Sequence, residues 1–362
     1  GQVTFVYHNA GNYTGGYTLD ASERLLGHSI AFTSANLGFT LAVHSAGLPT
    51  VGTNPTLTGT VTLANNSIVR GIDVATAGVV GLAGVSAIGV TVDSGSISAT
   101  GAPAVTLADS GGTFTLTSIS SSGSATHGIS LTNQTGAFTG NGGTIATSAG
   151  NDFIVSGGTA GILYAGTITN TAGQSVSVDN HDSGDVILSG TISDTGTGLL
   201  VQNCNGGIVT FSGATKTLNT GVNTAVTLTS NSGATINFSN GGLAITTSTG
   251  IGYLATGGGT INVTGTVNTI NSTSAAALSV TGTTIGSSLL VFQSISSGNN
   301  TASADPASGI ILSSTGSSGG VLVTGSANTT VGGDASGGLI QNTSSHGVSL
   351  ISTLNASFTN LN

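Results

Sequence analysis

The densest group of residues that could do chemistry is the stretch DNHDSGD, residues 179–185, in which Asp179, Asp182 and Asp185 surround His181. Carboxylate oxygens at alternate or third positions are ligands that Ca²⁺ prefers in proteins. The spacing matches neither the EF-hand loop nor the calcium repeat GGxGxDxUx. We therefore expect a solvated turn here, and a Ca²⁺ site formed by the three aspartates is the alternative interpretation.

Acid–base chemistry on a polysaccharide would need a different set of residues. Glycosidic cleavage requires paired carboxylates, or a metal-stabilised anion, on one face of the protein. Glu23 is the only glutamate of the chain. The only Lys and Arg residues of the chain, Arg24, Arg70 and Lys216, are far apart from one another in sequence. We expect no catalytic residue and no enzyme activity. The alternative is a carbohydrate-binding or carbohydrate-active protein, similar to a lyase or hydrolase, with one binding face.

Metal, thiol and nucleic-acid chemistry find little support in the composition. The 6 histidines show no HExxH or similar spacing, and the single cysteine, Cys204, can form neither an internal disulfide nor a zinc cluster. A formal net charge of −9 with 3 Lys+Arg leaves nothing to neutralise a row of phosphates. We expect no cofactor and no nucleic-acid partner.

The chain is apolar without being a membrane span. Its mean hydropathy is +0.36, yet it contains no run of about 18 consecutive apolar residues, so no transmembrane helix is predicted. The sequence begins at Gly1 without a basic and then apolar secretory segment. We expect it to be a processed or excised piece.

Any site on this chain must be positioned by a short repeated element. A pattern of small, apolar, polar and apolar residues returns ten times, first as AVTL at 104–107 and next as GISL at 128–131. Successive copies begin 23 to 38 residues apart, most of them close to 24, and periods of this size are typical of stacked repeats. Segments rich in Val, Ile, Thr and Gly predict strands rather than helices.

The predicted fold is therefore all-β: a right-handed parallel β-helix, or β-solenoid, with three short strands per coil. The period gives roughly 12 to 14 coils over the 362 residues. We expect residues 1–59 to form the N-terminal cap and first coils, and residues 60–362 to form the regular β-helix. Longer loops are predicted at 293–309 and 324–347. Inserted loops map to one face and favour binding, although a plain surface excursion is the other interpretation.

A core ladder follows from the period of the strands. Alternate side chains of a strand face opposite sides, so the second and fourth positions of the repeated pattern point inward. Stacking the coils places the second positions in one internal column. The predicted core ladder is Val105, Ile129, Phe153, Val176, Leu199, Val226, Tyr253, Leu278, Ile310 and Val348.

A turn ladder accompanies the core ladder. Five residues after the first position of each pattern lies a residue that is typical of turns, and Asn and Gly also tolerate a positive φ. The predicted turn ladder includes Asp109, Asn133, Asn180 and Asn203.

The last residues, NASFTNLN at 355–362, follow a strand-like segment without a polar or helical cap. An open coil exposes apolar core and unpaired strand edges. We expect this edge to continue into more coils of the same polypeptide or to stack end to end on another copy, and Phe358 and Leu361 are the candidates for that contact.

Long segments such as ITNTAGQSVSVDNHDSGDVILSGTISDTGTGLLVQN and SNSGATINFSNGGLAITTSTGIGYLATGGGTINVTG repeat these features. Over nearly its whole length the chain resembles the β-strand-repeat, autotransporter- or adhesin-like proteins of bacteria. The resemblance implies an extracellular parallel β-helix of the bacterial cell surface, used as a stalk, an adhesive surface or an envelope component, with no catalytic motif to carry over.

We therefore expect a non-enzymatic structural or adhesive module that is part of a larger surface protein or stacks into a fibre. Its expected partners are further coils or copies of itself, and a surface glycan or the surface of a host or neighbouring cell.

Overall fold

The chain folds as an all-β solenoid of about 12 turns built from three parallel sheets, which confirms the predicted fold class. One four-residue helix, α1 (Ser34–Leu37), is the only helix in the part of the chain that the structure describes, and no helix there is long and apolar enough to cross a membrane. The structure is a computed structural model that describes residues 1–8, 11–31, 33–38, 52–301, 304–326 and 334–362.

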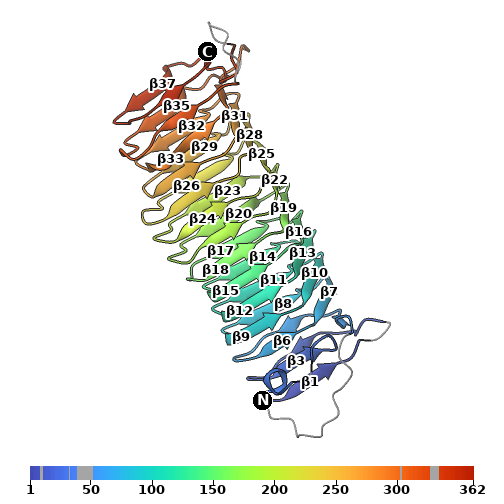
Figure 1. Cartoon of the computed structure of the whole chain (residues 1–362). Coiled ribbons are helices and arrows are strands. Elements are labelled where there is room, and N and C mark those ends of the chain that lie inside the picture. Colours follow the sequence, from blue (N-terminus) through green and yellow to red (C-terminus); the bar gives the residue numbers. More distant parts are fainter. Residues whose placement is uncertain (9–10, 32, 39–51, 302–303, 327–333) are drawn as a thin grey trace. The chain divides into compact units, whose positions relative to one another are not determined.

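Two compact units divide the chain, unit 1 (Gly1–Thr167) and unit 2 (Ile168–Asn362). In Figure 1 the strands of unit 1 run from blue to green and those of unit 2 from green through yellow to red. We call the sheets A, B and C. From β4 (Thr56–Leu57) to β36 (Val321–Val323) the chain visits them in the repeating order B, C, A, so that each turn contributes one strand to each sheet.

The strands of unit 1 pair in parallel with the next strand of the same sheet. Sheet A contains β1 (Val3–Val6), β3 (Arg24–Gly27), β6 (Ile68–Arg70), β9 (Ile88–Asp93), β12 (Gly111–Leu116), β15 (Thr135–Gly140) and β18 (Gly161–Tyr164). Sheet B contains β4 (Thr56–Leu57), β7 (Asp73–Ala77), β10 (Ser96–Thr100), β13 (Ser118–Ser122) and β16 (Thr144–Ala146). Sheet C contains β2 (Tyr17–Thr18), β5 (Val61–Thr62), β8 (Leu82–Val85), β11 (Val105–Ala108), β14 (Ile129–Thr132) and β17 (Phe153–Ser156).

Unit 2 repeats the arrangement. Sheet A contains β21 (Val186–Leu188), β24 (Ile208–Phe211), β27 (Thr235–Phe238), β30 (Thr260–Val263), β33 (Thr284–Phe292), β36 (Val321–Val323) and β38 (Ser357–Phe358). Sheet B contains β19 (Thr167–Asn170), β22 (Ile192–Asp194), β25 (Lys216–Gly221), β28 (Leu243–Thr247), β31 (Thr269–Ser272) and β34 (Ser294–Ser297). Sheet C contains β20 (Gln174–Asp179), β23 (Gly198–Gln202), β26 (Val226–Thr229), β29 (Tyr253–Thr256), β32 (Leu278–Thr281), β35 (Ser308–Ser313) and β37 (His346–Ile351).

Parts of the predicted N-terminal region and loops lie outside the described residues. They are residues 9–10, 32 and 39–51 of the N-terminal region, 302–303 of the first loop and 327–333 of the second. Within the first predicted loop, Ser294–Ser297 form strand β34 instead, because they pair in register with β31.

The core ladder lies in sheet C. In unit 1, Val105, Ile129 and Phe153 are register partners in succession. In unit 2 the succession is Val176, Leu199, Val226, Tyr253, Leu278, Ile310 and Val348. All of these side chains except that of Val348 are at most 1% exposed. Each large apolar side chain buried in this way contributes roughly 1.5–3 kcal/mol.

Val348 departs from the prediction, since it is only partly buried. It lies on β37, the last strand of sheet C among the described residues, and therefore has a coil on one side only. Burial of a ladder position requires a coil on both sides.

The turn ladder lies at the corner between sheets C and A, where the backbone turns through a left-handed residue. The φ angles of Asp109, Asn133, Asn180 and Asn203 are 50°, 48°, 55° and 55°. Asn and Asp tolerate this conformation better than other residues with a Cβ. Asn133 Nδ2 also donates to Asp109 Oδ1 at 2.8 Å, so one corner is tied to the next.

Sheet A of unit 2 contains a large bulge. Ile261 pairs with Ile285 and Val263 with Leu290, so four residues of β33 lie opposite the single residue Asn262. The last of the four, Leu289, has a φ of 69°. Bulges of this kind redirect a strand and mark places where a repeat departs from its regular form.

Candidate functional site

The corner between sheets A and B of unit 2 contains two buried polar side chains. Lys216 begins β25 and is 1% exposed. Its Nζ donates to the carbonyl oxygens of Gly213, Ser239 and Gly241 at 2.5, 2.9 and 2.7 Å. The three N–H groups of an ammonium match these three acceptors, so the inward-facing carbonyls are satisfied. Burial lowers the pKa of Lys216 to about 8.

Asn268 occupies the same corner two coils further along. It is 1% exposed, and its Nδ2 donates to the carbonyl oxygens of Thr264 (3.3 Å), Gly265 (3.3 Å) and Val291 (3.0 Å). Its Oδ1 accepts from the N–H of Leu243 at 3.0 Å. The two N–H groups of the amide thus donate to three carbonyl oxygens, as the three N–H groups of the Lys216 ammonium do, and one amide N–H is shared between two acceptors.

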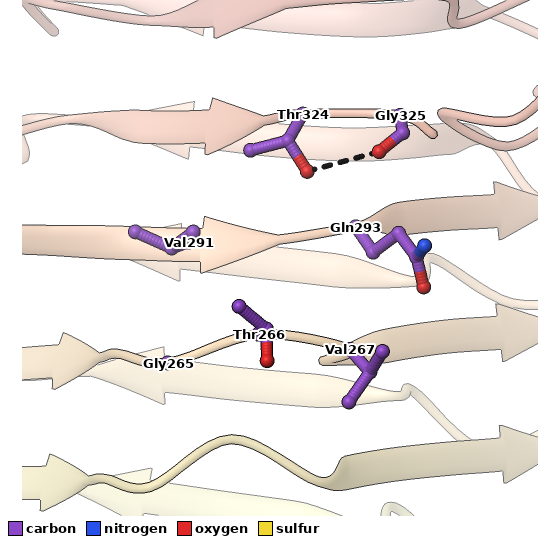
Figure 2. Close-up of a pocket in the computed structure, with 7 residues that line it drawn as sticks. All are labelled: Gly265, Thr266, Val267, Val291, Gln293, Thr324 and Gly325. Atoms are coloured by element: carbon purple, nitrogen blue, oxygen red, sulfur yellow. Dashed lines mark hydrogen bonds between the residues drawn. The ribbon is translucent and has the colours of Figure 1, made fainter. Parts of the chain in front are cut away.

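The Asn268 corner borders a surface hollow of about 190 Å³. Three consecutive coils line it: Gly265, Thr266 and Val267 on the first, Val291 and Gln293 on the second, and Thr324 and Gly325 on the third. Figure 2 shows these three levels one above the other, with the Gln293 side chain between Val267 and Gly325.

The hollow arises from unequal corner lengths. On the first coil the corner takes five residues, 264–268, between the end of β30 at Val263 and the start of β31. On the second coil Gln293 alone connects β33 to β34. Since the coils stack in register, the short corner is recessed next to the long one, and the recess is the hollow.

Several hydrogen-bonding groups at the hollow are free to meet a ligand. The backbone N–H groups of Gly265, Thr266 and Val267 and the side-chain amide of Gln293 form no hydrogen bond with any other described residue. The Thr324 hydroxyl, in contrast, donates to the Gly325 carbonyl at 3.2 Å (Figure 2). The hollow therefore offers a ligand free backbone N–H donors and a free side-chain amide.

Backbone strain coincides with the hollow. Val267 has a φ of 57°, which is an outlier for a β-branched residue, and its side chain is 56% exposed. Such a conformation costs of order 1–3 kcal/mol and is typical of ligand contacts and other functional sites. Leu289, the other bulky apolar residue with a positive φ in the described ranges, lies two residues before Val291.

The chemistry of the hollow is that of binding. None of the seven lining residues is titratable, so the hollow contains no general acid or base. It combines the methyl groups of Val267 and Val291 with amide and hydroxyl groups. Such a surface can hold a small neutral ligand that is partly apolar and carries hydrogen-bond acceptors.

The predicted calcium ligands do not come together. Asp179 Oδ1 accepts from Asn203 Nδ2 at 2.9 Å and Asp182 Oδ1 from Asn205 Nδ2 at 3.4 Å, each reaching the following coil. Asp185 is exposed. Across the described ranges, no group of three or more His, Cys, Asp or Glu side chains could hold a metal ion, so the three aspartates are not gathered into such a group.

The turn around these aspartates also differs from the expected solvated turn at one residue. His181 is only 1% exposed, whereas its neighbours Asp182 and Ser183 are exposed. Cys204 on the following coil is likewise fully buried, and burial raises the pKa of its thiol, whose Sγ donates to the Gln202 carbonyl at 3.3 Å.

Glu23, which is far from the hollow in sequence, accepts hydrogen bonds from three other residues. The Tyr17 hydroxyl donates to its Oε1, the Thr4 hydroxyl lies 3.1 Å from the same oxygen, and the N–H of Asp20 donates to Oε2 at 2.8 Å. Burial raises the pKa of Glu23, but these hydrogen bonds outweigh it and the pKa lies below its ordinary value. The carboxylate therefore stays ionised and ties the first coils of unit 1 together.

The sequence reasoning missed Lys216, Asn268 and the hollow residues Val267 and Gln293. One signal was present: aligned on the end of the sheet A strand, the segments SGATK (212–216) and TGTVN (264–268) share a glycine three residues before the polar cap. Gln293 and Thr324 are also the first residues of the two segments that were predicted to be inserted loops.

Comparison with known proteins adds no relative. No family model matches the chain, and neither the curated proteins nor the solved structures contain a match. The resemblance to bacterial β-strand-repeat proteins therefore depends on the sequence patterns, and the structure supports its coarser part, the parallel β-solenoid.

Proposed function

We propose that this chain is a non-enzymatic extracellular module of a bacterial surface protein, whose role is structural or adhesive. The observation that supports it most directly is the repetition of one coil. In each unit the same inward position is buried from coil to coil and the same corner carries a left-handed residue. Features that recur on every coil serve the stack, because each coil lacks enough core to be stable alone.

Polar groups inside the stack support the same role. Lys216 and Asn268 each donate three hydrogen bonds to backbone carbonyl oxygens, and Asp194 accepts three from backbone N–H groups. Asp194 receives the N–H groups of Ser175, Gly196 and Gly198. These side chains are engaged in holding corners, which leaves them unavailable for chemistry on a substrate.

We further propose that the edge at β37 pairs with another coil, supplied by the same polypeptide or by a second copy. Leu350 is the register partner of the fully buried Leu312, yet it is 47% exposed. Ile351 and Leu354 beside it are 58% and 54% exposed. Apolar side chains on an unpaired strand edge favour pairing with a further strand. Phe358 and Leu361 are partly buried, and Phe358 lies on β38, the last strand of sheet A among the described residues.

Sedimentation velocity at increasing concentration tests pairing between copies. We expect concentration-dependent oligomers for the chain and their loss in Leu350→Asp. The matched control is Val222→Asp, because Val222 is 69% exposed and lies on a corner of unit 2. Oligomers that persist in Leu350→Asp, or that are lost equally in Val222→Asp, would contradict pairing through this edge. Surface labelling of intact source cells with an antibody against the chain tests the extracellular location.

A further inference from the structure

The size of the hollow limits what it can accept. Its volume is about 190 Å³ and it extends over three coils, which corresponds to roughly 10 Å along the stack because neighbouring strands lie about 4.8 Å apart. This is too small for a folded partner surface or a large cofactor, since pockets for drug-sized ligands have volumes of about 300–1,000 Å³. One ring-sized group fits.

The polar groups of the hollow favour a ligand with several oxygen acceptors. The N–H groups of Thr266 and Val267, which have no hydrogen-bond partner among the described residues, are donors on one coil, and the Gln293 amide offers both a donor and an acceptor on the next. Val267 and Val291 add aliphatic surface. A ring with hydroxyl groups around its edge and C–H groups on its face meets all of these.

Charge argues for a neutral ligand. The lining residues include no cation that could pair with an anion and no carboxylate that could pair with a cation. Asp334 is linked to Ser326, the neighbour of Gly325, at 3.5 Å, and hydrogen bonds from Ser336 lower the pKa of its carboxyl so that it stays ionised. This carboxylate and the net charge of −9 repel anions.

We propose that the hollow binds a single neutral sugar residue of a glycan. The N–H groups of Thr266 and Val267 and the Gln293 amide bind its hydroxyl oxygens, and the Val267 and Val291 methyl groups pack against its C–H face. The strained backbone of Val267 keeps that side chain at the rim of the hollow. This binding goes beyond the structural role of the stack and does not depend on it.

Saturation-transfer NMR on the whole chain tests the proposal with the methyl glycosides of glucose, galactose, mannose and N-acetylglucosamine. At least one is expected to bind with a Kd on the order of 1 mM, because a ligand of about 12 heavy atoms gains little binding energy. Gln293→Leu is expected to weaken binding about fivefold through the loss of one or more hydrogen bonds. Gln293 makes no side-chain bond to a described residue, so the variant should fold.

The matched control is Gln202→Leu on sheet C, a partly buried glutamine outside the hollow. It is expected to bind as the unchanged chain does. A second variant, Thr266→Phe, fills part of the hollow with a larger side chain without changing Gln293 and is also expected to weaken binding. The proposal is overturned if none of the four glycosides binds, if Gln293→Leu and Thr266→Phe bind unchanged, or if methyl glucuronide, an anionic sugar, binds more tightly than the neutral ones.

Discussion

Two corners of unit 2, one capped by Lys216 and the other by Asn268, solve the same problem with different side chains. Each cap is the fifth residue after the end of a sheet A strand, which is Phe211 in one case and Val263 in the other. Each donates to the carbonyl three residues before it, that of Gly213 or Gly265. The corner requires a donor for its inward carbonyls, and the chemical identity of that donor is secondary.

The two corners differ in what lies on the next coil. After the Lys216 coil comes a corner of equal length, 239–242, whose carbonyls Lys216 also caps. After the Asn268 coil comes the single residue Gln293, and the surface is left hollow. The capping side chain of a coil thus satisfies the carbonyl oxygens inside its corner. Whether the surface next to that corner is filled or hollow depends on the length of the corner on the next coil.

The sharpest test of the common role is Asn268→Asp. It replaces the two N–H donors by a carboxylate that faces three carbonyl oxygens and has no cation nearby among its hydrogen-bond partners. We expect the free energy of unfolding to fall by about 3–5 kcal/mol, the usual cost of an uncompensated buried charge. Urea unfolding measures it, with Asn271→Asp, an exposed position on β31, the strand that follows Asn268, as control. Equal stability of both variants would contradict the capping role.

Lys216→Met tests the other corner. The methionine keeps much of the volume but leaves the carbonyls of Gly213, Ser239 and Gly241 without their donor. We expect a loss of about 2–3 kcal/mol, less than for Asn268→Asp because no unpaired charge is created. Thr217→Met, exposed on the same strand, is the control for the same unfolding measurement. A stable Lys216→Met chain would show that water replaces the ammonium.

Val267→Gly tests the backbone strain that only the Asn268 corner has at its surface. A glycine adopts a φ of 57° without strain, so relief of about 1–3 kcal/mol is offset by about 0.5–1 kcal/mol of backbone entropy. We expect a net gain of about 1 kcal/mol in unfolding free energy. Val222→Gly is the control, because Val222 is exposed and is not among the positive-φ residues, so that variant should lose stability. Loss of stability in both would contradict strain at Val267.

The smallest expected effect is a pH dependence. Burial lowers the pKa of Lys216 to about 8 from 10.5, so between these values the unfolded chain binds more protons and stability rises with pH. The hydrogen bonds to three carbonyls favour the ammonium, so we expect a gain of at most about 1 kcal/mol. Unfolding at pH 8 and at pH 9.5 measures it, compared with Lys216→Met. An equal slope in that variant would assign the effect to other groups.

Sequence reasoning succeeded where a feature recurs and failed where it occurs once. The fold class followed from ten similar patterns, because a strand alternates and a stack repeats. The pattern wrongly predicted a buried Val348, since the burial of this side chain depends on whether another coil covers it. The hollow was missed because its residues, Val267 and Gln293, lie in corners of unequal length on different coils. A contact between coils cannot be deduced from one coil's pattern.

The amino-acid sequence alone determines the period, the inward positions such as Ile129, and the left-handed corner at Asn133, because each depends on residues close together in the chain. The tertiary structure alone decides that Lys216 and Asn268 face inward rather than into water, and that Gln293 is recessed beside Val267. Both outcomes depend on the length and register of the neighbouring coil, about 25 residues away in sequence, and stacking brings the Lys216 and Asn268 side chains within hydrogen-bond distance of that coil.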